Sequence, residues 1–342
     1  MKDENNYDLD LYEILEIHPR ACSRVVIAAF GALSKIHHPD VGGDSNIYRR
    51  ILDANKILSD AGERSRYDAQ RRTLYDGAIG LSYKILEKIA EGGFGPTYKA
   101  RHILSGELAC IKHCHRISVQ NNQILLDEAK TVWDLRHHAL PAMRDVIKLE
   151  DGSLAIVMSY IPGPTLEQIV ESNGSIEPEH VAWIAERVLN ALMYLHYHGV
   201  IDGDVKPQNI IINLDTHTVT VIDFGISLVK PNGSSRAKGW TEGFAPPEEK
   251  AGRTLVPESD LYSLGMTMIY ALSGNYDAML RKDVPSSTPE PLCEFIRRLI
   301  VADVLSRPNW QKEDLTSTIN QVREQSFGRG HSDMKPLLLK KK

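Results

Sequence analysis

The feature that most constrains the fold of this chain is an ordered series of short motifs between residues 91 and 248. In chain order they read EGGFG, ACIK, LLDEAK, DVKPQN, VIDFG and GFAPPE. A glycine-rich turn alone would indicate little, because such loops occur in many unrelated proteins. The order and spacing of the whole series therefore restrict the fold far more than any single residue does.

The segment that contains these motifs has two parts with different secondary structure. From Tyr83 onward, strand-like runs are broken by glycine turns, which predicts a small β-rich lobe. The remainder is mostly helical. One predicted helix covers Glu179 to His198, with Pro178 at its first turn and Gly199 just past its end. Another, from Ser259 to Leu272, is apolar on most sides and is expected to be buried.

With these motifs in this order, the chain resembles the protein kinase family over about residues 83 to 325. The resemblance implies a bilobal fold, with a β-rich amino-terminal lobe and an α-rich carboxy-terminal lobe. It also implies transfer of the ATP γ-phosphate to a hydroxyl group of a protein substrate. The expected fold class of the whole chain is α+β.

The resemblance assigns a catalytic task to four polar residues. Lys112 is expected to hold the α- and β-phosphates of ATP, and Glu128, on a predicted helix, to keep Lys112 in place. Asp204 is expected to accept the proton of the substrate hydroxyl, and Lys206 to neutralise charge on the phosphoryl group in transit.

ATP and Mg²⁺ are the cofactors that the resemblance implies. Asn209 and Asp223 are the expected Mg²⁺ ligands, because oxygen donors suit this ion. Glycines of the loop allow backbone N–H groups to approach the phosphates without a side-chain clash. The expected nucleotide-binding residues are Gly92, Gly93, Gly95, Thr97, Cys110, Lys112, Met158, Ser159 and Ile161.

Three further resemblances concern support and specificity. Glu248 in GFAPPE and Arg307 in SRP are expected to pair, and Asp260 begins the helix expected to hold the catalytic loop. Thr241 stands where serine/threonine kinases place a threonine that bonds the catalytic Asp and Lys. This position favours serine and threonine as acceptors over tyrosine.

The catalytic loop departs from the family pattern at two positions. Asp202 and Gly203 stand where kinases usually have His and Arg. Gly203 cannot bond a phosphate on the activation loop, and Asp202 is expected beneath Phe224 and close to Asp260. Two carboxylates there would repel unless one is protonated, or Asp202 turns to solvent or to a cation.

These departures leave three hypotheses open. The chain is an active serine/threonine kinase, or a pseudokinase scaffold that only binds nucleotide, or a co-chaperone regulated by its kinase lobe. Every residue expected to touch phosphate, metal or the substrate hydroxyl is present, which favours the active enzyme.

The first seventy residues predict a helical hairpin. Apolar residues repeat at helical spacing in three stretches, and the Pro- and Gly-rich HHPDVGGD must be a loop. Antiparallel packing of the second and third helices is the simplest way to bury both stripes. The residues expected inside are Leu9, Leu11, Tyr12, Leu15 and Ile17, then Val25, Val26, Ala29, Phe30 and Leu33, and finally Ile47, Ile51, Ala54, Ile57 and Leu58.

This region resembles the J domain of co-chaperones over roughly residues 7 to 70, through YEILEI, the His38-Pro39-Asp40 loop and ANKILSDAGERSRYD. The resemblance implies binding to a heat-shock ATPase of the seventy-kilodalton class, with His38, Pro39 and Asp40 as the contact residues. In the family the second helix is strongly basic. Here it carries only Arg24 and Lys35, which weakens charge-steered docking.

Four parts are predicted: a J domain at 1–71, a linker at 72–82, a kinase domain at 83–325 and a basic polar tail at 326–342. The net charge of −5 argues against general nucleic-acid binding, and no apolar run is long enough to cross a membrane. Four cysteines without a disulfide framework fit a reducing cytoplasm. Metal binding by Cys110 to His115 is disfavoured, because these side chains alternate across a strand.

Overall fold

The computed structural model describes residues 11–18, 21–75, 78–79, 82–92, 95–113, 119–149, 153–232, 235, 239–328 and 337–339. The chain divides into two compact units, Met1–Ala78 and Ile79–Lys342. The short strand β1 (Ala78–Ile79) spans the boundary between them.

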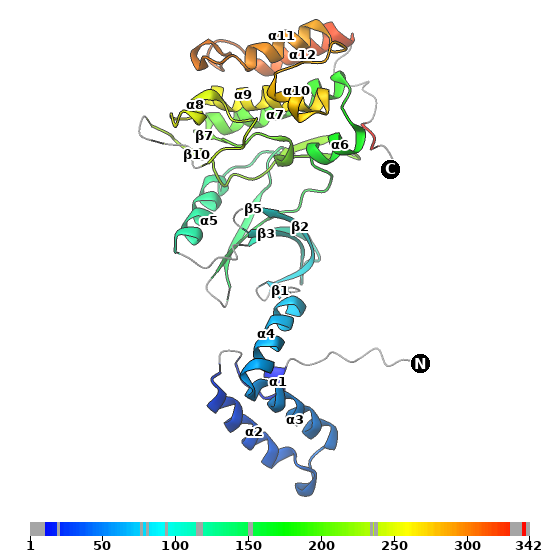
Figure 1. Ribbon diagram of the computed structural model, residues 1–342, viewed down its shortest axis with the longest axis vertical. Coiled ribbons are helices and arrows are strands. Elements are labelled where there is room, and N and C mark those ends of the chain that lie inside the picture. The colour runs from blue at the N-terminus through cyan, green and yellow to red at the C-terminus, as the bar shows by residue number, and fades with distance from the viewer. Residues whose placement is uncertain are drawn as a thin grey trace. The chain divides into compact units, whose positions relative to one another are not determined.

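The first unit is helical, as predicted. It contains α1 (Leu11–Ile14), α2 (Ser23–His37), a 3-10 turn at Pro39–Val41, α3 (Ser45–Ser59) and α4 (Ala61–Tyr75). The side chain of Asp44 caps α3 by accepting the N–H of Asn46 at 2.7 Å. Helices α2 and α3 pack side by side (Figure 1), which confirms the predicted hairpin. A Cβ at Gly43 would meet the His37 carbonyl at 2.2 Å, so the loop requires glycine there.

The core of this unit is smaller than the sequence predicts. Its buried members are Tyr12, Leu15, Val26, Leu33, Ile51, Ala54 and Leu58. Val25 and Ile47, which were expected inside, are 45% and 44% exposed. Val26 occupies the inward position on α2, and Val25 is turned from it by the roughly 100° that separates consecutive helical residues. The first helix ends at Ile14, earlier than the expected end near Pro19, and Leu9 lies outside the described residues.

The second unit begins with an antiparallel sheet in the order β2, β3, β4, β6, β5. Its strands are β2 (Tyr83–Gly92), β3 (Gly95–His102), β4 (Leu108–His113), β5 (Met143–Lys148) and β6 (Leu154–Ser159), and α5 (Val119–Val132) lies between β4 and β5 in the chain. The register places Lys112 opposite Thr97 and Cys110 opposite Met158. Residues that pair directly share one face, so these four side chains point to the same side of the sheet.

The other face of the sheet is apolar. It carries a buried cluster made of Tyr83, Tyr98, Ala100, Ala109, Ile111, Ala155 and Val157. The two faces alternate along β4, where Ile111 belongs to the cluster and its neighbours do not. This alternation fixes the face on which Lys112 projects, because a slip by one residue would bury it in the apolar cluster.

The rest of the second unit is mainly helical, as predicted. It contains α6 (Leu166–Asn173), α7 (Pro178–Tyr197), α8 (Pro247–Lys250), α9 (Pro257–Ser273), α10 (Tyr276–Leu280), α11 (Glu290–Leu299) and α12 (Leu315–Phe327). Short strand pairs are formed by β7 (Val200–Ile201) with β10 (Leu228–Val229), and by β8 (Ile210–Asn213) with β9 (Thr218–Val221). Helices α7 and α9 pack against each other (Figure 1). Most of their residues are buried.

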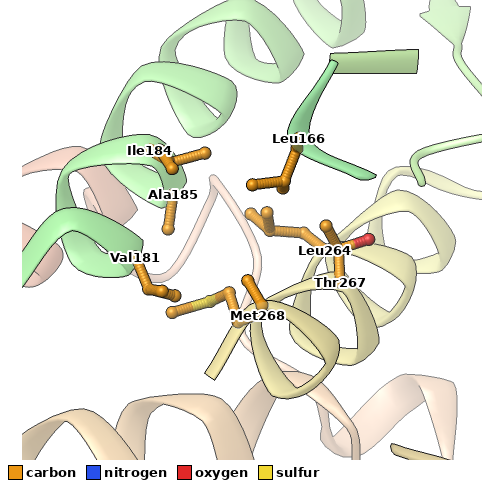
Figure 2. Close-up of a pocket in the computed structure, with 8 residues that line it drawn as sticks. Leu166, Val181, Ile184, Ala185, Leu264, Thr267 and Met268 are labelled. Atoms are coloured by element: carbon orange, nitrogen blue, oxygen red, sulfur yellow. The ribbon is translucent and has the colours of Figure 1, made fainter. Parts of the chain in front are cut away.

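A small apolar cavity lies between α6, α7 and α9 (Figure 2). It is lined by Leu166, Val181, Ile184, Ala185, Leu264, Thr267, Met268 and Ala271. The hydroxyl of Thr267, the polar group among these lining residues, donates to the Ser263 carbonyl at 2.8 Å. With its polar group satisfied inside its own helix, this space is a packing gap of the core.

Two predicted bounds fall inside helices. Helix α4 continues to Tyr75, past the expected domain end at residue 71, and α12 continues to Phe327, past residue 325. The expected tail also contains an anchored part: Leu337 is buried in the main core, and the Asn173 side chain donates to the Leu338 carbonyl at 3.0 Å. Residues 340–342 lie outside the described residues. The four-part division of the chain stays a prediction.

Candidate functional site

The first group of site residues meets on the polar face of the sheet. Lys112 Nζ lies 2.8 and 2.9 Å from the two carboxylate oxygens of Glu128 on α5, and 2.7 Å from Oδ1 of Asp223. Burial alone lowers the pKa of Lys112, but these two carboxylates outweigh it and hold that pKa above its usual value. Lys112 is therefore a buried cation fixed by two anions, as expected from its place in ACIK.

Asp223 follows β9 and has an unusual backbone. Its φ of +68° lies in the left-handed region, which non-glycine residues seldom adopt. Burial raises its pKa, but Lys112 overrides this effect and lowers the pKa below its usual value, so the carboxyl is an anion. A strained, anionic carboxylate beside a fixed cation is a suitable oxygen donor for a divalent ion.

The second group joins the loop between β7 and β8 to Thr241, which lies between β10 and α8. Lys206 Nζ is 2.7 Å from Oδ2 of Asp204, and the Thr241 hydroxyl donates to Oδ1 of Asp204 at 2.7 Å. Lys206 also donates to Thr241 at 2.9 Å. The structure thus brings together Asp204, Lys206 and Thr241, the three residues that the sequence expects to contact one another.

Asn209 joins this group through its amide. Its Nδ2 donates to the carbonyl oxygen and to Oδ2 of Asp204, both at 3.1 Å. These bonds fix which way the side chain faces, because they use its donor end. The amide oxygen is not used in these two bonds, and it is the atom that would coordinate a metal ion. Asn209 and Asp223 therefore both fit the ligand type that Mg²⁺ prefers.

The backbone of the loop between β7 and β8 is held by a side chain of α9. Asp260 Oδ2 accepts the N–H of Asp202, and Oδ1 accepts the N–H of Gly203, both at 2.8 Å. Gly203 has φ +77°, and a Cβ there would lie 3.2 Å from Leu255 Cδ1. Glycine at this position therefore relieves both backbone strain and a close contact.

Two residues of this support were not found from the sequence. His196 Nε2 lies 2.7 Å from Oδ2 of Asp260, and Trp310 Nε1 donates to His196 Nδ1 at 2.7 Å. They lie 114 positions apart in the chain. No local motif marks either residue, so only the fold reveals the contact.

Asp202 does not turn to solvent, which was one of the expected alternatives. Its residue exposure is 1%, and Phe224 is buried too. Its Oδ1 accepts the N–H of Asp204 at 2.9 Å, and its carbonyl accepts the hydroxyl of Ser227 at 2.9 Å. Burial, followed by the charge of Asp260, raises the pKa of Asp202 well above its usual value.

The expected adenine contacts lie at the end of β6. The N–H of Ser159 donates to the Ala142 carbonyl at 2.9 Å, and the Ser159 hydroxyl accepts the Ala142 N–H at 2.9 Å. Of the backbone groups of Ser159, the carbonyl is therefore the one suited to a nucleotide. Burial raises the pKa of Cys110 to about 12, so this residue faces the site as a neutral thiol.

The glycine loop joins β2 to β3. Gly92 ends β2 and pairs with Gly95, which begins β3 with φ +140°. This φ is accessible to glycine and strained for other residues. Gly93 lies outside the described residues.

The activation-segment anchor is a buried ion pair. Arg307 donates to both carboxylate oxygens of Glu248, at 2.7 and 2.9 Å, and Ser259 donates to the same carboxylate at 2.8 Å. Burial raises the pKa of Glu248, but Arg307 and Ser259 together lower it below its usual value. The predicted pairing of Glu248 with Arg307 is thus present.

The His38-Pro39-Asp40 loop of the first unit is exposed. The N–H of Asp40 donates to His38 Nδ1 at 3.2 Å, and the His38 ring meets Tyr48 edge-on at 4.7 Å. The side chain of Asp40 is 88% exposed. The motif is therefore ordered locally and open to a partner.

No helix in the described part of the chain is long and apolar enough to cross a membrane. No cluster of three or more His, Cys, Asp or Glu residues suited to a metal occurs in the described ranges. Cys114 and His115, two of the residues weighed for a metal site, lie outside those ranges.

Comparisons with known proteins match both units. The family model of the protein kinase domain matches residues 83–317, and that of the DnaJ domain matches residues 10–68. Serine/threonine-protein kinases C and D of Synechocystis sp. (strain ATCC 27184 / PCC 6803 / Kazusa) are 33% and 31% identical over 221 and 210 residues. The matches cover 59% and 56% of this chain.

Another relative is serine/threonine-protein kinase PknB of Mycolicibacterium smegmatis (strain ATCC 700084 / mc(2)155). It is 32% identical over 203 residues, which cover 56% of this chain and 32% of that protein. The matches to the two Synechocystis kinases cover 41% and 40% of their lengths. The chain thus matches less than half of each of these relatives.

Proposed function

The chain belongs to the protein kinase family, and we propose that it transfers the γ-phosphate of ATP to serine or threonine hydroxyls of proteins. The observation that carries this proposal is the contact of Asp204 with Lys206 and Thr241, at 2.7 Å each. The second support is the contact of buried Lys112 with Glu128 and Asp223. Loss of one such residue would have favoured a scaffold that only binds nucleotide.

In this proposal Asp204 orients the attacking hydroxyl and accepts its proton. Oδ1 and Oδ2 of Asp204 are already held by Thr241 and Lys206, so little reorganisation is needed when the substrate arrives. Lys206 then lies close enough to offset negative charge on the phosphoryl group. Thr241 supports serine and threonine as acceptors.

ATP would lie against the polar face of the sheet. Lys112 would bond the α- and β-phosphates, and the Ser159 carbonyl and Ile161 N–H would bond adenine. Asn209 and Asp223 would hold Mg²⁺, which neutralises phosphate charge when bound. Gly92, Gly93 and Gly95 would let the backbone approach the phosphates, and Thr97, Cys110 and Met158 would line the adenine side.

The first unit is proposed to recruit a heat-shock ATPase of the seventy-kilodalton class. The exposed His38-Pro39-Asp40 loop supports this role. Helix α2 carries only Arg24 and Lys35 as long basic residues, so the affinity should depend little on salt. Protein substrates and this chaperone are the proposed partners, and the cytoplasm is the proposed location.

The proposal is tested by transfer of labelled phosphate from ATP to a generic basic protein, with and without Mg²⁺. Wild type should label the acceptor on serine or threonine only when Mg²⁺ is present. The Asp204→Asn variant should not, whereas Asp215→Asn, a change in the exposed turn between β8 and β9, should behave as wild type. Nucleotide binding by wild type without any transfer would show a scaffold and refute the proposal.

A further inference from the structure

Three successive backbone N–H groups of the catalytic loop donate hydrogen bonds to carboxyl oxygens. Those of Asp202 and Gly203 go to Asp260, at 2.8 Å each, and that of Asp204 goes to Oδ1 of Asp202 at 2.9 Å. The backbone of Asp204, the proposed base, is thus held by the side chain of Asp202, two positions earlier in the chain. Asp202 and Asp260 lie next to each other, and both are 1% exposed.

Asp260 is the charged member of this pair. The indole N–H of Trp310 can only donate, so His196 Nδ1 must accept and Nε2 must carry the proton. Nε2–H then donates to Oδ2 of Asp260 at 2.7 Å. Asp260 therefore accepts three hydrogen bonds in a buried position, which is what an ionised carboxylate requires.

Asp202 lacks such stabilisation. Its Oδ2 is buried without a hydrogen-bond partner among the described residues. No lysine or arginine in the described ranges lies within 4.0 Å of its carboxyl group; instead its carboxyl neighbours are Asp260 and, more weakly, Asp204 and Asp223. An ionised Asp202 would place an unpaired charge in a buried site among three other carboxyls, which is strongly unfavourable.

We propose that Asp202 is a positioning residue that acts as a neutral carboxylic acid, fixing the N–H of Asp204 without adding negative charge beside the base. Oδ1 accepts the N–H, and the proton resides on Oδ2. The proposal deepens the proposed phosphotransfer function and rests on it for its kinetic consequence. Its structural consequence, the charge state and the hydrogen bond, does not depend on that function.

Two substitutions separate the hydrogen bond from the charge. Asp202→Asn keeps an oxygen that can accept the N–H of Asp204 and replaces the acid proton by an uncharged amide of similar size. Asp202→Ala removes the acceptor and leaves the partly buried N–H of Asp204 without it. The change to Ala should lower kcat by about ten- to a hundredfold at pH 7, whereas the change to Asn should retain most activity.

The pH dependence of protein stability gives a second test of whether Asp202 is neutral. An acid whose pKa is raised by folding is ionised first in the unfolded chain, so its contribution to stability falls as pH rises above its unfolded value of about 4. The melting temperature of Asp202→Asn should therefore exceed that of wild type at pH 8, and the gap should shrink towards pH 5. Asp215→Asn, an exposed aspartate, should show no such gap at either pH.

Glu249 is another buried acid in this region and must be separated from Asp202. Burial, with smaller contributions from Asp260, Asp204 and Glu248, raises its pKa to about 8. If Asp202 ionises at high pH, wild type should lose kcat there, and Asp202→Asn should flatten this loss. Glu249→Gln should leave the part due to Asp202 in place.

The decisive experiment uses the full chain in three forms: wild type, Asp202→Asn and Asp202→Ala. Amide hydrogen exchange of Asp204 should stay slow in the Asn form and become faster in the Ala form, and the melting temperatures should follow the pH trend above. Equal melting of wild type and the Asn form from pH 5 to 8, or equally fast exchange in both variants, would overturn the inference. If wild type transfers no phosphate, the proposed function fails, and exchange and melting alone decide the role of Asp202.

Discussion

The His38-Pro39-Asp40 loop and the proposed catalytic centre differ in how their residues are brought together. The loop motif is complete within three residues, is exposed, and is ordered by contacts as local as the 3.2 Å bond from Asp40 to His38. The catalytic centre joins Lys112 to Asp223 across 111 positions and is largely buried. A local motif can therefore be altered without unfolding its unit, whereas a buried, non-local centre couples function to the fold.

The catalytic centre should show the largest single effect. Asp204→Asn removes the proton acceptor and disturbs the bonds to Lys206 and Thr241, so kcat should fall by at least about a thousandfold. Single-turnover transfer of labelled phosphate measures this effect, with Asp215→Asn as the control. Equal rates for wild type and Asp204→Asn would remove the basis for assigning catalysis to this loop.

The buried anchor tests how strongly fold and site are coupled. Arg307→Ala leaves Glu248 as an uncompensated buried charge and should lower the free energy of unfolding of the kinase unit by about 3–5 kcal/mol. Arg297→Ala, which removes an exposed ion pair with Glu290, should change stability little. Thermal unfolding measures both.

The unfolding transition of the first unit shows whether Arg307→Ala affects only the kinase unit or destabilises the whole chain. Its unfolding transition should be unchanged in Arg307→Ala, because its core is its own cluster around Leu58 and Ile51. A parallel drop of both transitions would contradict the separation of the two units.

The exposed loop should behave in the opposite way. His38→Gln should leave the helical signal and melting of the first unit unchanged, since the His38 ring meets Tyr48 edge-on and otherwise accepts the Asp40 N–H, a bond that the glutamine oxygen can also accept. It should abolish stimulation of a responsive heat-shock ATPase, measured as phosphate release, whereas His18→Gln should not. If wild type does not stimulate ATP hydrolysis by any of several such ATPases, the small number of basic residues on α2 would explain the lack of stimulation. The first unit would then serve only as an interaction module.

The same contrast explains which features the sequence could predict. The sequence could select Lys112, Glu128, Asp204 and Asp223 as candidates because their motifs occur in a fixed order. It predicted the helices α7 and α9 because their apolar patterns and end signals are strong. The inward position of Val25 was predicted wrongly, since a run of apolar residues on α2 leaves the centre of the buried stripe undefined.

Contacts that only the fold creates could not be predicted. Trp310 bonds His196, and His196 in turn bonds Asp260. These three residues come from distant segments, and no local pattern marks His196 or Trp310. From the sequence, Asp202 could be buried or turned to solvent, because burial of a carboxyl group depends on the residues that pack around it. The anchoring of Leu337 in the core was likewise hidden in a tail of polar composition.

The smallest effect is expected from phosphorylation of the activation segment. In regulated kinases the residue before the catalytic Asp bonds such a phosphate with a guanidinium group, and Gly203 has none. Ser227 is fully buried with its hydroxyl bonded to the Asp202 carbonyl, and the Thr241 hydroxyl is bonded to Asp204, so neither suits a regulatory phosphate. Ser235 is the described alternative, while Ser234, Arg236 and Lys238 lie outside the described residues.

We therefore expect the Ser234→Ala, Ser235→Ala double variant and phosphatase-treated wild type to keep activity within about twofold of untreated wild type, because the charge-assisted pairs that a loop phosphate usually gains require a guanidinium that Gly203 lacks. Initial rates of labelled phosphate transfer, with intact mass measured before and after phosphatase treatment, check this. Restoring an arginine by Gly203→Arg should not help, since φ +77° strains any side chain and its Cβ would press on Leu255. Loss of most activity in either dephosphorylated sample would mean that a basic residue other than one at position 203 binds the phosphate. The activity would then depend on phosphorylation of the activation segment, contrary to what the absence of a guanidinium at Gly203 predicts.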